Sequence, residues 1–318
     1  MKKALITGIA GFVGSHLAER LKGRYEVSGA LLGNDPGCVK GVDGLNLVHC
    51  DLLDKEAVSE LVGRTSPDVV FHLAALSAPS ISFKAPSRTL EVNIFSTLNL
   101  FESVYAYAPE ARVLNIGSGD EYGDADELPV TETAELRPLS PYAVSKVTQD
   151  LLAYQYWRSR GLNIVRCRPF NHYGPRQSDL FVCSAFARQI AEIEAGLKAE
   201  KTLSVGNIEA AKDFLDVSDV VSAYEILIER GVPGAVYNVC SGRATRIREI
   251  VEGLISLSTV RIDVVQDPER FRPADVKAVY GDATRLKALG WAPERGLEEG
   301  LKALLDFWRS RVAEGKPL

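Results

Sequence analysis

Short apolar runs alternate with segments of helical period through the first half of the chain. The runs are apolar on both faces, which is typical of buried parallel strands. The segments between them repeat apolar residues at three and four positions, as helices that cover a sheet do. The predicted strands are 3–7, 25–32, 46–50, 68–73, 112–116 and 162–167, and the predicted helices are 12–21, 55–62, 86–107 and 141–160. This alternation predicts an α/β fold with a doubly wound parallel sheet.

The pattern loosens after residue 168, where loops are longer and hold most of the proline and arginine clusters. The predicted elements here are helices 181–195, 219–229, 247–257, 283–289 and 297–312 and strand 236–239. We expect residues 1–168 to form the first domain, with roughly 214–242 returning to it. Residues 169–318 then mainly form a smaller C-terminal lobe over one end of the sheet.

Composition excludes several classes of protein. Lys and Arg number 37 and Asp and Glu 42, a net charge of −5 with no long basic run, so nucleic acid is not the expected partner. No apolar stretch approaches the ~20 residues of a membrane span. The five cysteines are scattered without a Cys/His cluster, so we expect no metal site, reduced thiols and a cytoplasmic location.

A glycine-rich loop follows the first strand and opens the first helix, with Gly8, Gly11 and Gly14 in the sequence Thr-Gly-Ile-Ala-Gly-Phe-Val-Gly. Glycines let a backbone approach a pyrophosphate, and the helix N-terminus, here Phe12 and Val13, offers free N–H groups to it. The context of strand, loop and helix predicts a dinucleotide site.

The coenzyme preference depends on the end of the second strand, Ala-Leu-Leu-Gly-Asn-Asp at 30–35. An acid there would bind the adenosine ribose of NAD, and none occupies that slot. We therefore expect NADP(H) to be favoured slightly, with NAD(H) left open. Asp51, after the third strand, is either an adenine contact or the N-cap of the next helix.

Tyr142 and Lys146 are four residues apart at the start of a predicted helix, so their side chains share one face. An ammonium group and a helix N-terminus both favour a phenolate, and we expect them to lower the pKa of Tyr142. Ser118 follows a predicted strand, on the ligand side of the sheet, where its hydroxyl could orient a carbonyl group. His172 is expected to be a loop hydrogen-bonding residue, and His16, His49 and His72 to occupy packing or helix positions.

Together these motifs resemble the extended short-chain dehydrogenase/reductases. The resemblance rests on the glycine loop, His-Leu-Ala-Ala at 72–75, Ser118 before Tyr122-Gly123, the Tyr142/Lys146 pair, Arg-Pro-Phe-Asn-His-Tyr-Gly-Pro at 168–175 and Leu-Gly-Trp at 289–291. It implies a catalytic set of Ser118, Tyr142 and Lys146, supported by Asn93. The cofactor contacts that it implies are Gly8, Gly11, Phe12, Val13, Gly14, Asp51, Leu52, Leu73, Ala74, Ala75, Asn93, Tyr142, Lys146, Pro169 and Phe170.

The second half is similar to enzymes of GDP-mannose metabolism, above all those that reduce GDP-4-dehydro-6-deoxy-D-mannose at C4 to GDP-D-rhamnose. The substrate contacts that this likeness implies are Ser77, Ser118, Asp120, Asn171, Val182, Lys212, Arg272 and Asp275. An arginine such as Arg272 can grip a phosphate with two hydrogen bonds. Lys212 stands where these enzymes usually have Arg, and Asp275 where they usually have Glu.

Three alternative functions stay open. A GDP-mannose 4,6-dehydratase needs a carboxylate base, usually a Glu two residues before the Tyr-Gly tyrosine, and Asp120 occupies that slot. A nucleotide-sugar 4-epimerase is the second alternative. A cofactor-binding regulatory subunit is the third, although such proteins typically lack the Tyr or the Lys.

Finally, we expect a homodimer that pairs helices 86–107 and 141–160. Both helices carry large apolar side chains on more than one face, whereas a sheet covers only one stripe of a helix. The side chains concerned are Phe95, Leu98, Phe101, Tyr154 and Trp157.

Overall fold

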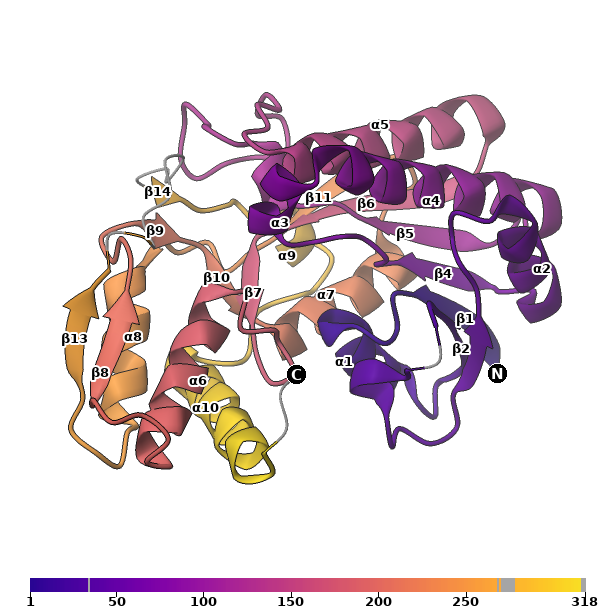
Figure 1. The fold of residues 1–318 in the computed structure, drawn as a ribbon. Coiled ribbons are helices and arrows are strands. Elements are labelled where there is room, and N and C mark those ends of the chain that lie inside the picture. Colours follow the sequence, from indigo (N-terminus) through magenta and orange to yellow (C-terminus); the bar gives the residue numbers. More distant parts are fainter. Residues whose placement is uncertain (34, 268, 270–277, 316–318) are drawn as a thin grey trace.

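A seven-stranded parallel sheet forms the centre of the molecule, in the order β3-β2-β1-β4-β5-β6-β11 (Figure 1). The computed structural model describes residues 1–33, 35–267, 269 and 278–315. The strands of the sheet are β1 (Lys2–Thr7), β2 (Tyr25–Leu31), β3 (Asn46–His49), β4 (Val69–His72), β5 (Arg112–Ile116), β6 (Asn163–Pro169) and β11 (Val236–Val239). The order reverses between β1 and β4, and ligands of doubly wound sheets bind at such a switch point, beyond the carboxyl ends of the strands.

Helices cover both faces of this sheet, as its apolar strands require. Ala4 and Ile6 of β1 join the core on one side and Leu5 the core on the other, because successive side chains point to opposite faces. The first side is covered by α1 (Phe12–Leu21), α7 (Val217–Arg230) and α9 (Thr284–Lys287). The second side is covered by α2 (Lys55–Thr65), α4 (Pro86–Tyr107) and α5 (Pro141–Arg160), with the short α3 (Pro79–Lys84) beside α4 and α5.

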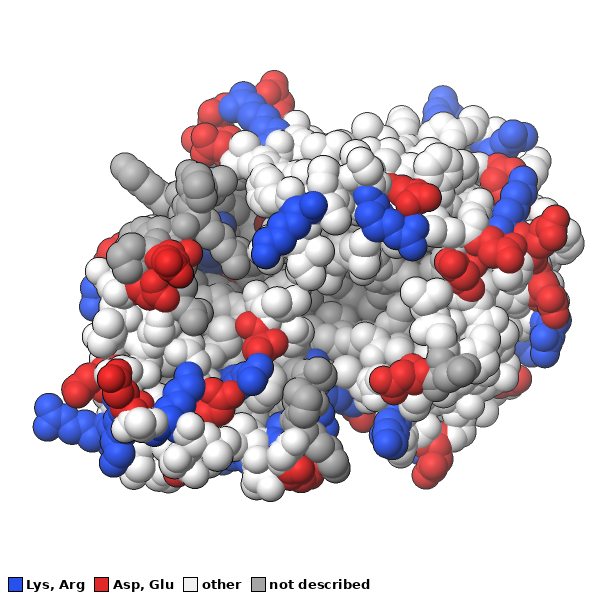
Figure 2. All heavy atoms as spheres, viewed as in Figure 1, with Lys and Arg blue, Asp and Glu red and all other residues white. Residues whose placement is uncertain are grey.

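A smaller lobe lies beside the sheet and has its own core, which includes Phe186, Leu254 and Trp308 (Figure 1). Its main elements are α6 (Val182–Glu194), α8 (Ile247–Ser256), α10 (Leu297–Ala313) and the parallel pair β8 (Thr202–Val205) and β13 (Asp263–Gln266). Short strands connect it to the sheet: β7 (Asn171–Tyr173) pairs with β10 (Phe214–Asp216), and β9 (Ala211–Lys212) with β12 (Thr245–Arg246) and β14 (Ala278–Val279). The surface is hollowed between the lobe and the sheet (Figure 2).

The predicted doubly wound α/β fold is confirmed. Helices α1, α4 and α5 begin and end at the predicted residues, because their apolar stripes, prolines and glycines mark both ends. The prediction missed α3 and the short strands of the lobe, which run for only two to four residues. Strand β11 adds to the edge of the sheet beside β6, and α7 packs on α1.

Two further observations concern membranes and metals. Among the described residues, no helix is both long and apolar enough to cross a bilayer. The same part of the chain holds no group of three or more His, Cys, Asp or Glu side chains that could bind a metal ion.

Candidate active site

The glycine loop between β1 and α1 lies against the end of β4. Gly8 has φ +73°, and a Cβ there would come within 2.9 Å of the backbone nitrogen of Ala74. A Cβ at Gly14 would overlap the carbonyl oxygen of Gly8. Gly11 is the N-cap of α1 and has no capping side chain, so the first helical N–H groups, those of Phe12 and Val13 included, are not capped by it. This loop and helix end fit the pyrophosphate of a dinucleotide.

A series of hydrogen bonds between buried side chains holds Thr7, the residue before the first glycine of the loop, in place. His72 Nδ1 lies 2.8 Å from Thr7 Oγ1 and His72 Nε2 lies 2.8 Å from Thr97 Oγ1. Thr97 donates its only hydroxyl proton to the carbonyl oxygen of Asn93, so Nε2 must carry the proton of the imidazole and Nδ1 must accept from Thr7. Burial lowers the pKa of His72 to about 3, which keeps the ring neutral. Leu73, Ala74 and Ala75 follow directly, and the Ala74 N–H donates to Thr7 Oγ1.

Asn93 joins the loop after β4 to the helix that carries Tyr142. Its Oδ1 accepts from the Leu76 N–H at 2.7 Å, and its Nδ2 donates to Leu76 O and to Ser145 Oγ. Ser145 in turn donates to the carbonyl oxygen of Tyr142 at 2.6 Å. Asn93 therefore connects the exposed Ser77, one residue after Leu76, to the first turn of α5.

Ser118, Tyr142 and Lys146 come together at the carboxyl end of β5. The Ser118 hydroxyl is hydrogen-bonded to the Tyr142 phenol, and Lys146 Nζ lies 6.0 Å from the centroid of the phenol ring. Nζ donates to the carbonyl oxygen of Ile116 at 2.9 Å, and burial lowers the pKa of Lys146 to about 8. Ser140 caps α5 by accepting from the Ala143 N–H, and Pro141 takes the first helical position, so the helix begins where the sequence predicts.

The prediction that the pKa of Tyr142 is lowered is wrong for this arrangement. Burial of the phenol, and next the charge of Asp120, raise that pKa, and only the hydrogen bond from Ser118 opposes them. Lys146 is directed to Ile116 O instead. At neutral pH Tyr142 is therefore a phenol that can donate a proton.

The remaining predicted cofactor residues lie around the same edge. Asp51 accepts from the Leu53 N–H, whereas Asp54 accepts from the N–H groups of Glu56 and Ala57 in the first turn of α2. Asp54 is therefore the N-cap, and this alternative for Asp51 is wrong. The carbonyl oxygen of Leu52 accepts from Asn99. Pro169 ends β6, and Phe170 packs against Gly119, where a Cβ would come within 3.0 Å of the ring.

The predicted substrate residues are spread over the hollow and the lobe. Asp120 is exposed and close enough to Tyr142 to raise its pKa. Asn171 is exposed at the start of β7, Val182 is the first residue of α6, and Lys212 is half-buried in β9. Arg272 and Asp275 lie outside the described residues.

Sequence reasoning missed a buried cluster of charges beneath the site. Arg168 contacts Glu121 at 2.9 Å and Asp150 at 2.8 Å, and Arg166 contacts Asp150 at 2.9 Å. The available signal was the pair of arginines inside an otherwise apolar strand, since a buried arginine needs a carboxylate partner.

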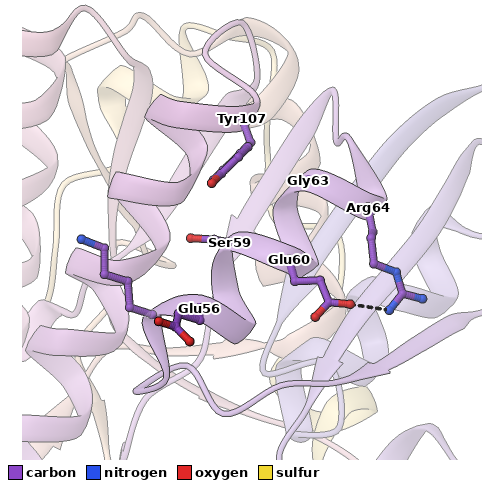
Figure 3. Close-up of a pocket in the computed structure, with 7 residues that line it drawn as sticks. Glu56, Ser59, Glu60, Gly63, Arg64 and Tyr107 are labelled. Atoms are coloured by element: carbon purple, nitrogen blue, oxygen red, sulfur yellow. Dashed lines mark hydrogen bonds and ion pairs between the residues drawn. The ribbon is translucent and has the colours of Figure 1, made fainter.

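A separate surface pocket lies along the length of α2, beside the end of α4 (Figure 3). It is lined by Lys55, Glu56, Ser59, Glu60, Gly63, Arg64 and Tyr107. Lys55 and Glu56 stand in the first turn of α2 and Arg64 in its last, while Tyr107 is the last residue of α4. This pocket contains none of the predicted site residues.

Known proteins resemble the chain over nearly its full length. The family model described as GDP-mannose 4,6 dehydratase matches residues 5–304. The GDP-6-deoxy-D-mannose reductase of Pseudomonas aeruginosa is 40% identical, with 98% of this chain and 99% of that protein covered. A GDP-mannose 4,6-dehydratase of Yersinia enterocolitica is 31% identical, with 94% and 91% covered.

Solved structures agree with this likeness. A structure of RMD from Pseudomonas aeruginosa complexed with NADPH has a TM-score of 0.85 and 39% identity, covering 98% of this chain and 100% of that one. A UDP-glucose 4-epimerase of Thermotoga maritima with UDP-glucose has a TM-score of 0.88 and 28% identity, covering 98% and 99%. The chain belongs to the GDP-mannose 4,6-dehydratase family and is an NAD(P)-dependent enzyme of the extended short-chain dehydrogenase/reductase type.

Proposed function

We propose that this protein reduces the C4 keto group of GDP-4-dehydro-6-deoxy-D-mannose to give GDP-D-rhamnose. The observation that carries the proposal is the Tyr142 phenol, which is held by Ser118 and has a raised pKa. Reduction of a ketone needs a proton donor at the developing alkoxide, and a protonated tyrosine is one. The 40% identity to a GDP-6-deoxy-D-mannose reductase supports this choice of substrate.

The nicotinamide supplies hydride to C4 when the cofactor is bound. Tyr142 donates its proton to the C4 oxygen, and Ser118 holds that oxygen while the charge develops. Lys146, fixed by Ile116 O, stands beside the phenol and binds the nicotinamide ribose. Asn171 and Arg272 hold the diphosphate, with Ser77, Val182, Lys212 and Asp275 as the other proposed sugar-nucleotide contacts.

The Rossmann part, residues 1–168 with the return of 214–242, binds the cofactor in this proposal, and the lobe built mainly from 169–318 binds the sugar nucleotide. NADP(H) is favoured over NAD(H), because Leu32 stands exposed after β2 where an NAD-selective enzyme would place an acid. A comparison of kcat/KM for NADPH and NADH tests this preference.

The direct test supplies GDP-4-dehydro-6-deoxy-D-mannose with NADPH and follows absorbance of the nicotinamide and the identity of the sugar product. Tyr142→Phe removes the donor but leaves the ring to pack, so kcat should fall by about 10²–10⁴. The Kd of NADPH should stay the same in this variant. A wild-type protein that never oxidises NADPH with this ketone would disprove the proposal.

A second candidate is the dehydration of GDP-mannose, favoured by the closeness of Asp120 to Tyr142. Dehydration needs a carboxylate base at C5, whereas reduction at C4 does not. Asp120→Asn should therefore leave the reduction within a few-fold of wild type. If the wild type converts GDP-mannose instead and Asp120→Asn abolishes that turnover, the protein is a dehydratase.

We also propose that the protein is a cytoplasmic homodimer that joins through α4 and α5. The cysteines of the described chain are free thiols, which fits a reducing compartment. The predicted dimer face needs one correction, because Phe101 is fully buried and Leu98 packs against the core under α4. Phe95 and Tyr154 are exposed as the proposal requires, while Trp157 is only half-exposed.

A further inference from the structure

Glu121 is fully buried at the end of β5, although its neighbour Asp120 is exposed. Its Oε1 accepts from the backbone N–H of Ser118 at 2.7 Å, and its Oε2 faces Arg168 Nε at 2.9 Å. Gly117 makes room for it, because a Cβ at Gly117 would overlap Glu121 Oε1. One carboxylate oxygen therefore accepts a backbone hydrogen bond, and the other makes an ion-pair contact without a hydrogen bond.

The Glu121 carboxylate is part of a network of ion pairs and hydrogen bonds that also includes α5, the helix that carries Tyr142 and Lys146. Arg168 also binds Asp150 at 2.8 Å and the Tyr122 hydroxyl at 3.0 Å. Asp150 lies on α5, eight residues after Tyr142, and Tyr122 donates to Asn238 of β11. Glu121 thus holds Ser118 in a fixed position relative to the helix that carries Tyr142 and Lys146.

The Ser118 side chain is fixed by a second contact. Its oxygen accepts from the Asp120 N–H at 3.1 Å, which closes a reciprocal capping arrangement with Glu121. The oxygen accepts in this contact, so the hydroxyl proton remains available to donate to Tyr142 or to a carbonyl group in the site. If the contact between Glu121 and the Ser118 N–H were lost, the Ser118 backbone would be free to move, and with it the direction of the Ser118 hydroxyl.

We propose that Glu121 is a positioning residue, which holds the Ser118 backbone so that the Ser118 hydroxyl meets Tyr142 and the C4 oxygen of the substrate. This inference rests on the proposed function for the identity of that oxygen. Stability alone does not account for Glu121, because buried ion pairs rarely stabilise a fold more than apolar side chains of the same volume.

Glu121 is not placed to act as a base itself. Burial and the charge of Asp150 raise its pKa, while Arg168, the Ser118 N–H and Lys146 act in the opposite direction. The charged groups that face it thus come from α5 and β6, and its oxygens contact the Ser118 N–H and the Arg168 guanidinium. Its effect on the reaction has to pass through Ser118.

A double-mutant cycle tests this route. In Glu121→Gln the charge that pairs with Arg168 is lost and one acceptor oxygen remains, so the hold on Ser118 is weakened. The rate of hydride transfer from NADPH to GDP-4-dehydro-6-deoxy-D-mannose, measured in a single turnover, should fall about tenfold, the size expected for one hydrogen bond to a charged group. The Kd of NADPH should change less than twofold. In a Ser118→Ala background the same substitution should change the rate less than twofold, because coupled residues are not additive.

Glu132→Gln is the matched control. Glu132 is also buried and accepts a backbone N–H, that of Asn238, but it does not contact Ser118. Its rate should match the wild type. An unchanged rate in Glu121→Gln, or an equal loss with and without Ser118, would overturn the proposal.

If circular dichroism shows that Glu121→Gln does not fold, the same rates and the Kd of NADPH are measured for Gly117→Ala. The added methyl group displaces the Glu121 carboxylate without removing its charge, so the same outcomes are expected. Failure of the proposed function is recognised separately. If the proposed function is wrong, the wild type does not oxidise NADPH in the presence of GDP-4-dehydro-6-deoxy-D-mannose. The double-mutant cycle is then measured with the nucleotide sugar that the wild type does convert.

Discussion

Tyr142 and His72 are both buried, and burial acts on each side chain by favouring its neutral form. A neutral phenol is the form that donates a proton to an alkoxide. A neutral imidazole can accept from Thr7 and donate to Thr97 at the same time, which a charged ring cannot do. Burial therefore keeps both of these groups neutral, although Lys146 Nζ lies 6.0 Å from the centroid of the Tyr142 ring.

The burial of His72 predicts a loss of stability in acid. Its pKa is lowered to about 3, whereas an unfolded histidine titrates near 6.5, so between these values the unfolded chain binds a proton that the native protein does not. Native stability therefore rises with pH across this window and falls as pH drops. Between pH 7 and pH 5 this group should cost about 2 kcal/mol.

Urea unfolding of wild type and His72→Gln at the two pH values measures this cost. The glutamine variant should lose about 2 kcal/mol less than the wild type on acidification. His49→Gln, a substitution of an exposed histidine at the end of β3, should follow the wild type. Equal acid sensitivity in all three proteins would contradict the prediction.

At the scale of elements, the sequence predicts the bounds of those helices whose ends are marked by a capping residue, a proline or a glycine. Helix α5 is capped by Ser140, begins at Pro141 and is followed by Gly161, which has φ +75°, and each of these residues is visible in the sequence. Strands β9 and β12 have two residues each, too few for any period to show.

The residues of the candidate site also divide into those that the sequence predicts and those that it does not. Ser118, Tyr142 and Lys146 could be predicted to lie close together because each sits at a fixed place relative to a strand end or a helix start. Glu121 and Asp150 were missed because their role depends on Arg168, and that contact joins residues distant in sequence. The pKa of Tyr142 could not be predicted because the depth of burial is a property of the fold.

The first turn of α1 can be tested by adding one methyl group. A Cβ at Gly14 would overlap Gly8 O, so Gly14→Ala must push the helix away from the loop. The Kd of NADPH should rise at least about tenfold, because the helical N–H groups no longer reach the pyrophosphate. Isothermal titration measures it.

Gly63→Ala provides the matched control in helix α2, where the nearest atom to a new Cβ is a Tyr107 ring carbon at 3.9 Å. With this space available, alanine should stabilise the helix by up to about 1 kcal/mol and leave the Kd unchanged. Tight binding of NADPH by Gly14→Ala would show that the pyrophosphate lies elsewhere.

At the scale of the whole molecule, the parts of the site come from both sides of the hollow. Phe12 of the glycine loop stacks on His172 of β7, with ring centroids 5.9 Å apart. His16 Nε2 lies 2.9 Å from the carbonyl oxygen of Pro175, and Arg176 pairs with Glu19 of α1. These contacts tie the segment that leads into the lobe to the start of α1, so the two parts meet beside the glycine loop.

The outer face of α4 and α5 is the predicted dimer interface. Phe95 is 53% and Leu151 is 56% exposed, although both helices pack on the same face of the sheet. Exposed large apolar side chains on adjoining helices favour association with a second apolar face. Sedimentation of the wild type at micromolar concentration should give a dimer mass.

Leu151→Glu places a charge in this face and should shift the protein to a monomer, since an unpaired charge at the centre of an interface is costly. Leu197→Glu is the matched control, because Leu197 is 68% exposed but lies after α6 in the lobe. This variant should remain a dimer. A wild type that sediments as a monomer would contradict the interface, and so would a Leu151→Glu protein that stays dimeric.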